Sequence, residues 1–105
     1  MDAIEDLRLR AVAHPSRRAI LRLVWNGERT ATEIAERCGV SAPAASQHLK
    51  TLREAKLVTV RRDATRRLYR VNIEEMRRLQ AFLEDFWAPR IEDLASAAER
   101  LDAQT

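Results

Sequence analysis

The sequence predicts a mainly helical domain that carries one small β-hairpin, an α+β fold. Apolar residues recur at spacings of three and four along most of the 105 residues, which is the period of an amphipathic helix. Residues 57–71 instead contain two short runs rich in β-branched residues around a polar turn, which is typical of a hairpin. A chain of this length usually forms one domain, so we expect residues 1–105 to fold as a unit.

Two helices are expected before residue 30. Residues 2–13 carry an apolar stripe at helical spacing, and His14-Pro15-Ser16 ends this helix, with His14 as a cap or hinge residue. Because proline is accommodated in a first turn, a second helix follows from Ser16 to Trp25, and Asn26-Gly27 is a typical stop.

Residues 30–55 predict two further helices joined by a sharp turn. Thr30 and Glu33 form a capping box that starts the first of them, and Ser41 can cap the second. Gly39 supplies the turn, because glycine accepts positive φ without steric cost. The residues expected to point inward are Ile34, Ala35, Cys38, Val40, Ala45, Leu49 and Leu52. This is a helix-turn-helix, whose second helix enters the major groove of DNA.

The hairpin at residues 57–71 is expected to form a "wing" beside the helix-turn-helix. Its strands run from Leu57 to Arg62 and from Arg66 to Val71, joined by residues 63–65. Strand alternation places Tyr69 inward and Leu68 on the outer face.

Four arginines surround the tip of this wing: Arg61, Arg62, Arg66 and Arg67. Like charges so close repel one another, so we expect a DNA backbone or minor groove to neutralise them. The alternative is a charged edge that prevents aggregation through unpaired strands.

The C-terminal segment, residues 73–105, predicts a long helix that opens at a second capping box, Asn72 with Glu75. Pro89 is expected to kink or divide it. Its apolar stripe exceeds what so small a domain covers, and we expect it, with the first helix (residues 1–14), to form a homodimer interface; completion of the monomer core is the alternative. The candidate interface residues are Ile4, Leu7, Phe82, Phe86, Trp87, Ile91, Leu94 and Leu101.

The net charge of +3 is distributed unevenly. Residues 15–72 contain 13 Lys and Arg against 5 Asp and Glu, a net charge of +8, whereas residues 1–14 carry −1 and residues 73–105 carry −4. The positive charge therefore coincides with the helix-turn-helix and the wing, as expected of a protein that binds a phosphate backbone. We expect double-stranded DNA to be the partner.

The N-terminal part of the second motif helix is expected to read base edges, while flanking residues hold phosphates. The base-reading candidates are Ser41, Pro43, Ala44, Ser46 and Gln47. The phosphate and wing candidates are Thr30, Thr32, Lys50, Thr51, Arg61, Arg62, Arg66 and Arg67. His48 flanks the buried side of the same helix and is expected to be a hydrogen-bonded structural residue.

Other functions find little support in the sequence. There is no nucleophile–base constellation and no glycine-rich phosphate loop, so an enzyme is not expected. No apolar stretch is long enough to span a bilayer, and one cysteine, Cys38, offers no internal disulfide, so we expect a cytoplasmic protein without a membrane partner. Cys38 is expected to be a small core residue.

The chain resembles the ArsR/SmtB-type winged-helix repressors of bacteria over nearly its whole length. The resemblance rests on HPSRRAILRLV, GVSAPAASQHLKTLREAKLV, RRLYRVN and the Phe86-Trp87 pair. It implies a homodimeric transcriptional repressor that dimerises through its first and last helices, with residues 41–55 as recognition helix. Relatives often have glycine where this chain has Ala64, which leaves the type of turn at the wing tip open.

Metal sensing, for which this family is best known, is not matched by the residues. Metal sensors usually carry a cysteine pair before the turn, where this chain has residues 33–36 without a thiol. The other sensor site uses histidines and carboxylates of the last helix, which here has carboxylates but no histidine. We therefore expect no metal and no cofactor.

Two alternatives to a repressor that is not metal-responsive remain. One is a winged-helix module for protein–protein contact, and the other is a metal- or redox-responsive repressor with an atypical site. The repressor is expected to act on its own or a neighbouring operon, under control of its abundance or of a small-molecule or protein effector that the sequence does not identify.

Overall fold

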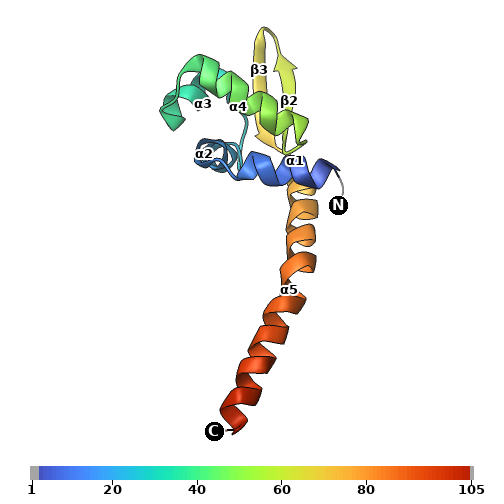
Figure 1. Ribbon diagram of the computed structural model, residues 1–105. Coiled ribbons are helices and arrows are strands. Elements are labelled where there is room, and N and C mark those ends of the chain that lie inside the picture. Colours follow the sequence, from blue (N-terminus) through green and yellow to red (C-terminus); the bar gives the residue numbers. More distant parts are fainter. Residues whose placement is uncertain (1–2, 105) are drawn as a thin grey trace.

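A body of four short helices and a small sheet carries one long helix that leaves it (Figure 1). The computed structural model describes residues 3–104. The elements are α1 (Ala3–Val12), α2 (Pro15–Leu23), β1 (Arg29–Thr30), α3 (Ala31–Cys38), α4 (Ala42–Glu54), β2 (Val58–Asp63), β3 (Arg66–Val71) and α5 (Ile73–Gln104). The three strands form an antiparallel sheet in the order β1-β3-β2.

The core lies where α1, α2, α3 and α4 meet the sheet. Its largest fully buried side chains include Ile20, Ile34, Leu49, Leu52 and Leu57. The predicted inward face of the helix-turn-helix is confirmed, although Cys38 and Val40 are only half-buried. Burying a leucine or isoleucine of this kind stabilises a fold by roughly 1.5–3 kcal/mol.

Side-chain caps fix the ends of the motif helices as predicted. The Thr30 hydroxyl accepts a hydrogen bond from the Glu33 amide at 3.2 Å, and the Glu33 carboxylate accepts one from the Thr30 amide at 3.2 Å. Gly39 ends α3 with φ +67°, and the Ser41 hydroxyl accepts the Ala44 amide at 3.2 Å to start α4. The turn between the two helices is therefore encoded locally.

The sheet differs from the predicted two-stranded hairpin by one strand. β1, only two residues long, pairs with β3 so that Thr30 lies opposite Leu68. Leu68 lies on the face of β3 opposite Tyr69, as strand alternation predicts, but the expectation that this side chain is outward was wrong: Leu68 is 9% exposed and Tyr69 is 7% exposed. Both residues are buried because β3 is the central strand and has a neighbour on each side.

The turn at the wing tip places a non-glycine residue in the left-handed region. Asp63 pairs with Arg66, which leaves Ala64 and Thr65 as a two-residue loop, and Ala64 has φ +56° whereas Thr65 does not have positive φ. Positive φ at the first loop position alone is the pattern of a type II′ turn, where glycine is preferred. The turn is therefore closed at some cost in strain.

Replacing Ala64 by glycine should stabilise the protein by about 0.5–1 kcal/mol. Relief of a left-handed alanine, roughly 1–2 kcal/mol, exceeds the added backbone entropy of glycine, roughly 0.4–1 kcal/mol. Urea unfolding followed by circular dichroism measures the change. Thr65→Gly is the matched control and should destabilise, because Thr65 gains no strain relief; equal effects of the two substitutions would contradict the interpretation.

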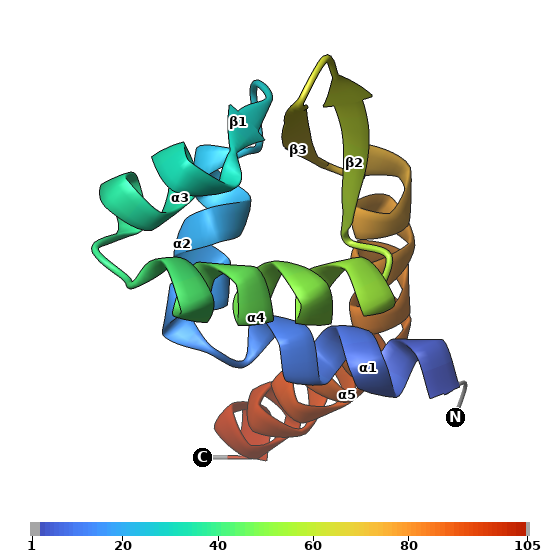
Figure 2. The same ribbon diagram turned by 90° about the horizontal axis from the view of Figure 1, so that it is seen from above.

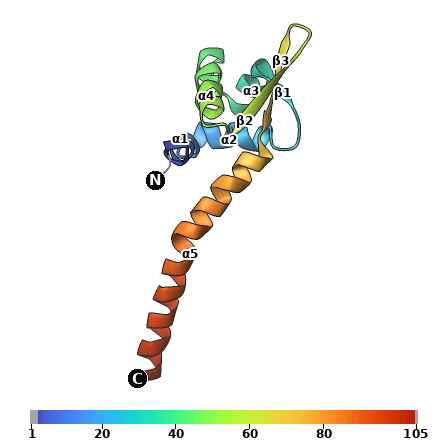
Figure 3. The same ribbon diagram turned by 90° about the vertical axis from the view of Figure 1, so that its right-hand side faces the viewer.

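The last helix is continuous and projects from the body. α5 runs unbroken through Pro89, so of the two predicted outcomes division into two helices is wrong, and Figures 1 and 3 show a gentle curve along its length. The radius of gyration is 18.4 Å, whereas a compact chain of this size has about 13 Å. The C-terminal half of α5 therefore has little of its own body to pack against.

The second helix, α2, ends earlier than predicted, at Leu23 instead of Trp25.

One charged residue, Arg8, is buried in the described part of the chain. α1 lies beside α4 and over the start of α5 (Figure 2), and Arg8 is 3% exposed between them. Its Nε donates to the carbonyl of Ala55 at 3.0 Å, its guanidinium pairs with the Glu75 carboxylate, and Glu5 lies 3.5 Å away. Arg8 thus ties α1 to the end of α4 and to the first turn of α5.

Candidate nucleic-acid interface

An open groove between the helix-turn-helix and the wing collects five of the predicted DNA-contact residues. It has a volume of about 460 Å³ and is lined by Thr30 and Thr32 at the start of α3, Ser46 of α4, and Arg66 and Arg67 of the wing. Figures 1 and 3 show α4 and the wing tip at the end of the molecule opposite the C-terminus of α5. Residues far apart in sequence therefore form one surface.

The exposed side of α4 presents most of the base-reading candidates to solvent. Ser41, Pro43, Ser46 and Gln47 are exposed, and Ala44 is half-buried. Ala45 and Leu49, on the opposite side, are buried and fix the rotation of the helix. The helical period of 3.6 residues was therefore enough to predict which side chains face outward.

The phosphate candidates on α4 differ from each other in what they already contact. Lys50 is exposed, and its side chain forms no hydrogen bond or ion pair within residues 3–104. The Thr51 hydroxyl donates to the Gln47 carbonyl at 3.2 Å within the helix. Binding a phosphate through Thr51 requires the exchange of that intrahelical bond, so Lys50 is the better placed of the two.

The four wing arginines divide into two pairs. Arg61 Nε lies 2.6 Å from the Glu28 carboxylate, which raises the pKa of the Arg61 guanidinium, and Arg66 lies 3.4 Å from the Asp63 carboxylate. The side chains of Arg62 and Arg67 form no hydrogen bond or ion pair with any residue in the described range 3–104.

Arg62 and Arg67 lie directly opposite each other on β2 and β3. Like charges in opposed positions destabilise a strand pair. Two residues further from the tip, the same face of the hairpin carries Val60 and Tyr69, which belong to the core or pack against it. The repelling pair therefore continues the inward face of the wing toward α4 and is available to an anion.

Sequence reasoning missed Arg53 as a member of this surface. Arg53 is exposed in the last turn of α4, and it lines a second hollow together with Arg61, Arg62 and Arg67. Its position seven residues after Ser46, two helical turns along the same side, was the signal that could have revealed it.

Known proteins with similar sequence and structure carry the same motif. A sequence model described as a helix-turn-helix domain matches residues 12–61. The HTH-type transcriptional regulator Rv2034 of Mycobacterium tuberculosis is 39% identical over 82 residues, which cover 78% of this chain and 77% of that protein. An ArsR-like transcriptional regulator from Rhodococcus sp. RHA1 superimposes with a TM-score of 0.78 at 25% identity, over 92% of each chain.

The chain belongs to the ArsR family of transcriptional regulators. A further ArsR-type neighbour, from Mycobacterium bovis, is 37% identical over 71% of this chain and 69% of its own, with a TM-score of 0.62. That structure is described as a homodimeric winged helix-turn-helix DNA-binding domain of a possible ArsR-family regulator. Like other members of its family, this ArsR-type chain is a DNA-binding transcriptional regulator.

Two histidines connect the recognition helix of this ArsR-family chain to the α1–α2 junction. The His14 Nδ1 accepts the Ser16 amide at 3.1 Å, so the predicted capping role is confirmed. The His48 ring lies 4.7 Å from the His14 ring, centroid to centroid, and is half-buried. The His48 side chain forms no hydrogen bond within the described residues, so the ring contact with His14 takes the place of the predicted hydrogen bond. Burial, and then the nearby His14 and Arg17, lower the pKa of His48.

Acidification is expected to destabilise this ArsR-type protein through His48. Its pKa in the fold lies below the ordinary value of 6.5, so the unfolded chain binds the proton more readily. The free energy of unfolding should therefore fall as the pH drops through about 6.5, with no contribution from this group above that range. Urea unfolding between about pH 7.5 and pH 5.5 should show a steeper fall for wild type than for His48→Gln; parallel curves would contradict the assignment.

Neither a metal cluster nor a membrane span emerges from the described residues of this ArsR-type chain. Within residues 3–104, no group of three or more His, Cys, Asp or Glu side chains is arranged to hold a metal ion. Cys38 is half-buried, and burial raises the pKa of its thiol. In the same range, every helix is too short or too polar to cross a membrane.

Proposed function

We propose that this chain is a homodimeric, sequence-specific repressor that acts on its own or a neighbouring operon. The observation that carries the proposal is the groove shared by α3, α4 and the wing. α4 would enter the major groove with Ser41, Pro43, Ala44, Ser46 and Gln47 toward the bases. Thr30, Thr32, Lys50 and the wing arginines would contact the flanking phosphates, and Thr51 would do so only by giving up its intrahelical bond.

Fluorescence anisotropy tests this proposal directly. The purified chain is titrated onto DNA from its own promoter region and onto a scrambled duplex at several salt concentrations. We expect tighter binding to the promoter and a log–log salt slope of about −0.9 for each phosphate contacted. Equal, weak binding to both duplexes would favour a module for protein–protein contact.

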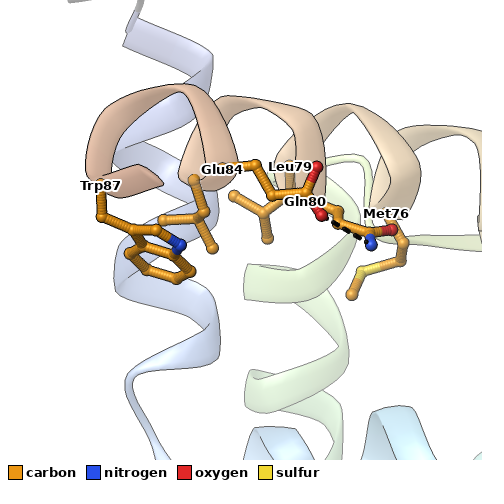
Figure 4. Close-up of a pocket in the computed structure, with 6 residues that line it drawn as sticks. Met76, Leu79, Gln80, Glu84 and Trp87 are labelled. Carbon is orange, nitrogen blue, oxygen red and sulfur yellow. Dashed lines mark hydrogen bonds between the residues drawn. The ribbon is translucent and has the colours of Figure 1, made fainter. Parts of the chain in front are cut away.

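Dimerisation through α5 and α1 is part of the same proposal. The exposed apolar residues of α5 recur at heptad-like spacing: Trp87, Ile91, Leu94 and Leu101 are 44–73% exposed. Figure 4 shows Trp87 beside an apolar hollow of about 350 Å³ that Met76 and Leu79 also line. Contiguous exposed apolar surface of this kind marks an interface.

The other interface candidates are less uniform in exposure. Leu7 is 42% exposed and Phe86 is 54% exposed, so both are free to meet a partner. Ile4 and Phe82 are half-buried. A second copy of the chain would place two recognition helices at half-sites about 34 Å apart, the spacing of one turn of DNA.

Substituting Ile91 and Leu94 together by aspartate should convert the dimer to a monomer. Two carboxylates in an apolar seam cannot be desolvated without a partner charge. Sedimentation analysis measures the change in mass, and promoter binding should fall with it because one half-site is lost. Glu92→Ala with Asp93→Ala is the control on the same turn, and it should remain dimeric. A monomeric wild type, or a dimeric variant, would argue against this interface.

A repressor of this kind would respond to something other than a metal. The lack of a clustered ligand set in residues 3–104 and the half-buried, lone Cys38 support this part of the proposal. The family also supports a protein that is not an enzyme and that works in the cytoplasm, where its DNA lies. An effector would have to change the relative setting of the two recognition helices through the dimer interface.

A further inference from the structure

The geometry points to a phosphate-binding cradle at the junction of α4 and the wing, formed by Arg53 together with Arg62 and Arg67. Its occupant is a backbone phosphate of duplex DNA. This inference rests on the proposed DNA-binding function and adds both a residue, Arg53, and a second contact region outside the groove that holds Ser46.

The cradle is a small open hollow with an unusual lining. It has a volume of about 240 Å³, and the lining residues are Arg53, Val60, Arg61, Arg62 and Arg67. Arg53, Arg62 and Arg67 thus lie around Val60, and none of the lining residues is acidic. Strand alternation places the Arg61 side chain on the other face of the hairpin, where it pairs with Glu28. Guanidinium groups match the geometry of phosphate oxygens and bind them bidentately.

The charge in the cradle is poorly compensated by the protein itself. Within residues 3–104, neither Arg62 nor Arg67 has a carboxylate partner, and the two repel each other across the strand pair. Arg53 forms no ion pair with a residue in the part of the chain that is described, and its side chain is exposed. An anion bound between these groups would remove the repulsion that the free protein retains.

The cradle is continuous with the proposed DNA surface. Arg67 lines both the cradle and the groove that contains Ser46, and Arg53 lines both the cradle and a hollow with Lys50. Ser46, Lys50 and Arg53 stand at spacings of four and three, so they share one side of α4, the side toward the wing. Together they form a basic track beside the recognition helix, and backbone phosphates repeat along such a track.

The salt dependence of binding to a mixed-sequence duplex tests the cradle, because phosphate contacts are independent of sequence. Arg53→Ala should flatten the slope of log affinity against log salt concentration by about 0.9. Between 50 and 200 mM salt, the loss of affinity in this variant should therefore be about 3.5-fold smaller than the loss in wild type. Arg53→Lys keeps the charge and should retain the wild-type slope. Arg100→Ala, at the far end of α5, removes the same charge and should also leave the slope unchanged.

The outcomes separate this inference from the proposed function. An unchanged slope for Arg53→Ala, or equal flattening by Arg53→Lys, would overturn the cradle while promoter preference of the wild type stands. Loss of promoter preference with a slope that depends on Arg53 would overturn specific repression but support the cradle. Inorganic pyrophosphate at constant ionic strength distinguishes the source of the phosphate. If it displaces duplex from wild type more readily than from Arg53→Ala, it competes with a DNA phosphate for the cradle, as expected. If it binds wild type through Arg53 without weakening duplex binding, a free anion rather than DNA is the occupant.

Discussion

Replacing Arg8 by alanine is expected to lower the free energy of unfolding by about 3–5 kcal/mol, the usual cost of removing one partner from a buried ion pair. The substitution leaves the Ala55 carbonyl without its donor, leaves Glu75 with only the exposed Arg78 as its ion-pair partner, and opens a cavity between α1, α4 and α5. Urea unfolding at fixed protein concentration measures the loss, since the stability of a dimer depends on concentration.

Two further variants show that the effect comes from the buried pair. Arg10→Ala removes an exposed arginine from the same helix and should change stability by less than about 0.5 kcal/mol. Arg8→Met with Glu75→Gln removes both charges together. This double variant should cost less than the sum of the two single substitutions, because neither charge is left unpaired. Additive losses would mean that Arg8 and Glu75 act independently.

Reversing the charge of Arg62 and Arg67 together is expected to weaken DNA binding by about 100-fold or more at low salt. Each charge-assisted contact is worth about 1.5–3 kcal/mol, and 1.4 kcal/mol corresponds to a factor of ten. The salt slope should flatten by about 1.8, the value for two phosphate contacts. Anisotropy titrations of Arg62→Glu/Arg67→Glu against wild type give both quantities. Wild-type affinity and slope in this variant would favour the protein-interaction module.

The single substitution Arg62→Glu separates DNA binding from stability. In the free protein it converts an opposed Arg–Arg pair into an opposed Glu–Arg pair, worth roughly 0.2–1 kcal/mol of stabilisation. The same change places a carboxylate where a phosphate should lie. A variant that unfolds at higher urea concentration and binds DNA more weakly is therefore expected. Destabilisation together with weaker binding would point to damage of the wing instead.

Features encoded within a few residues could be predicted from the sequence. The capping box of Thr30 and Glu33, the positive φ of Gly39 and the Ser41 cap all depend on hydrogen bonds or sterics over three or four positions. The buried side of α4 follows from its helical period, so the exposure of Ser46 and Gln47 was predictable as well.

Features that depend on distant parts of the chain were missed. β1 is two residues long and exists only because β3 offers it partners far along the chain, Tyr69 opposite Arg29 and Leu68 opposite Thr30. Arg8 is buried because groups 47 and 67 positions away receive its hydrogen bonds. Arg53 joins the DNA surface only once the hairpin folds back toward α4. Periodicity along the chain carries no information about such pairings.

The short strand β1 has a further consequence for how the protein meets DNA. Thr30 is both the last residue of β1 and the cap of α3, so pairing of β1 with β3 joins the helix-turn-helix to the wing through backbone hydrogen bonds. The helix-turn-helix and the wing, which form the two sides of the groove, are thereby held at a fixed separation before DNA binds. The entropy of ordering them relative to each other is lost during folding rather than at binding. In the proposed dimer, a signal that releases DNA would therefore have to rotate each such unit as a whole relative to its partner, because closing or opening the wing alone would break the sheet.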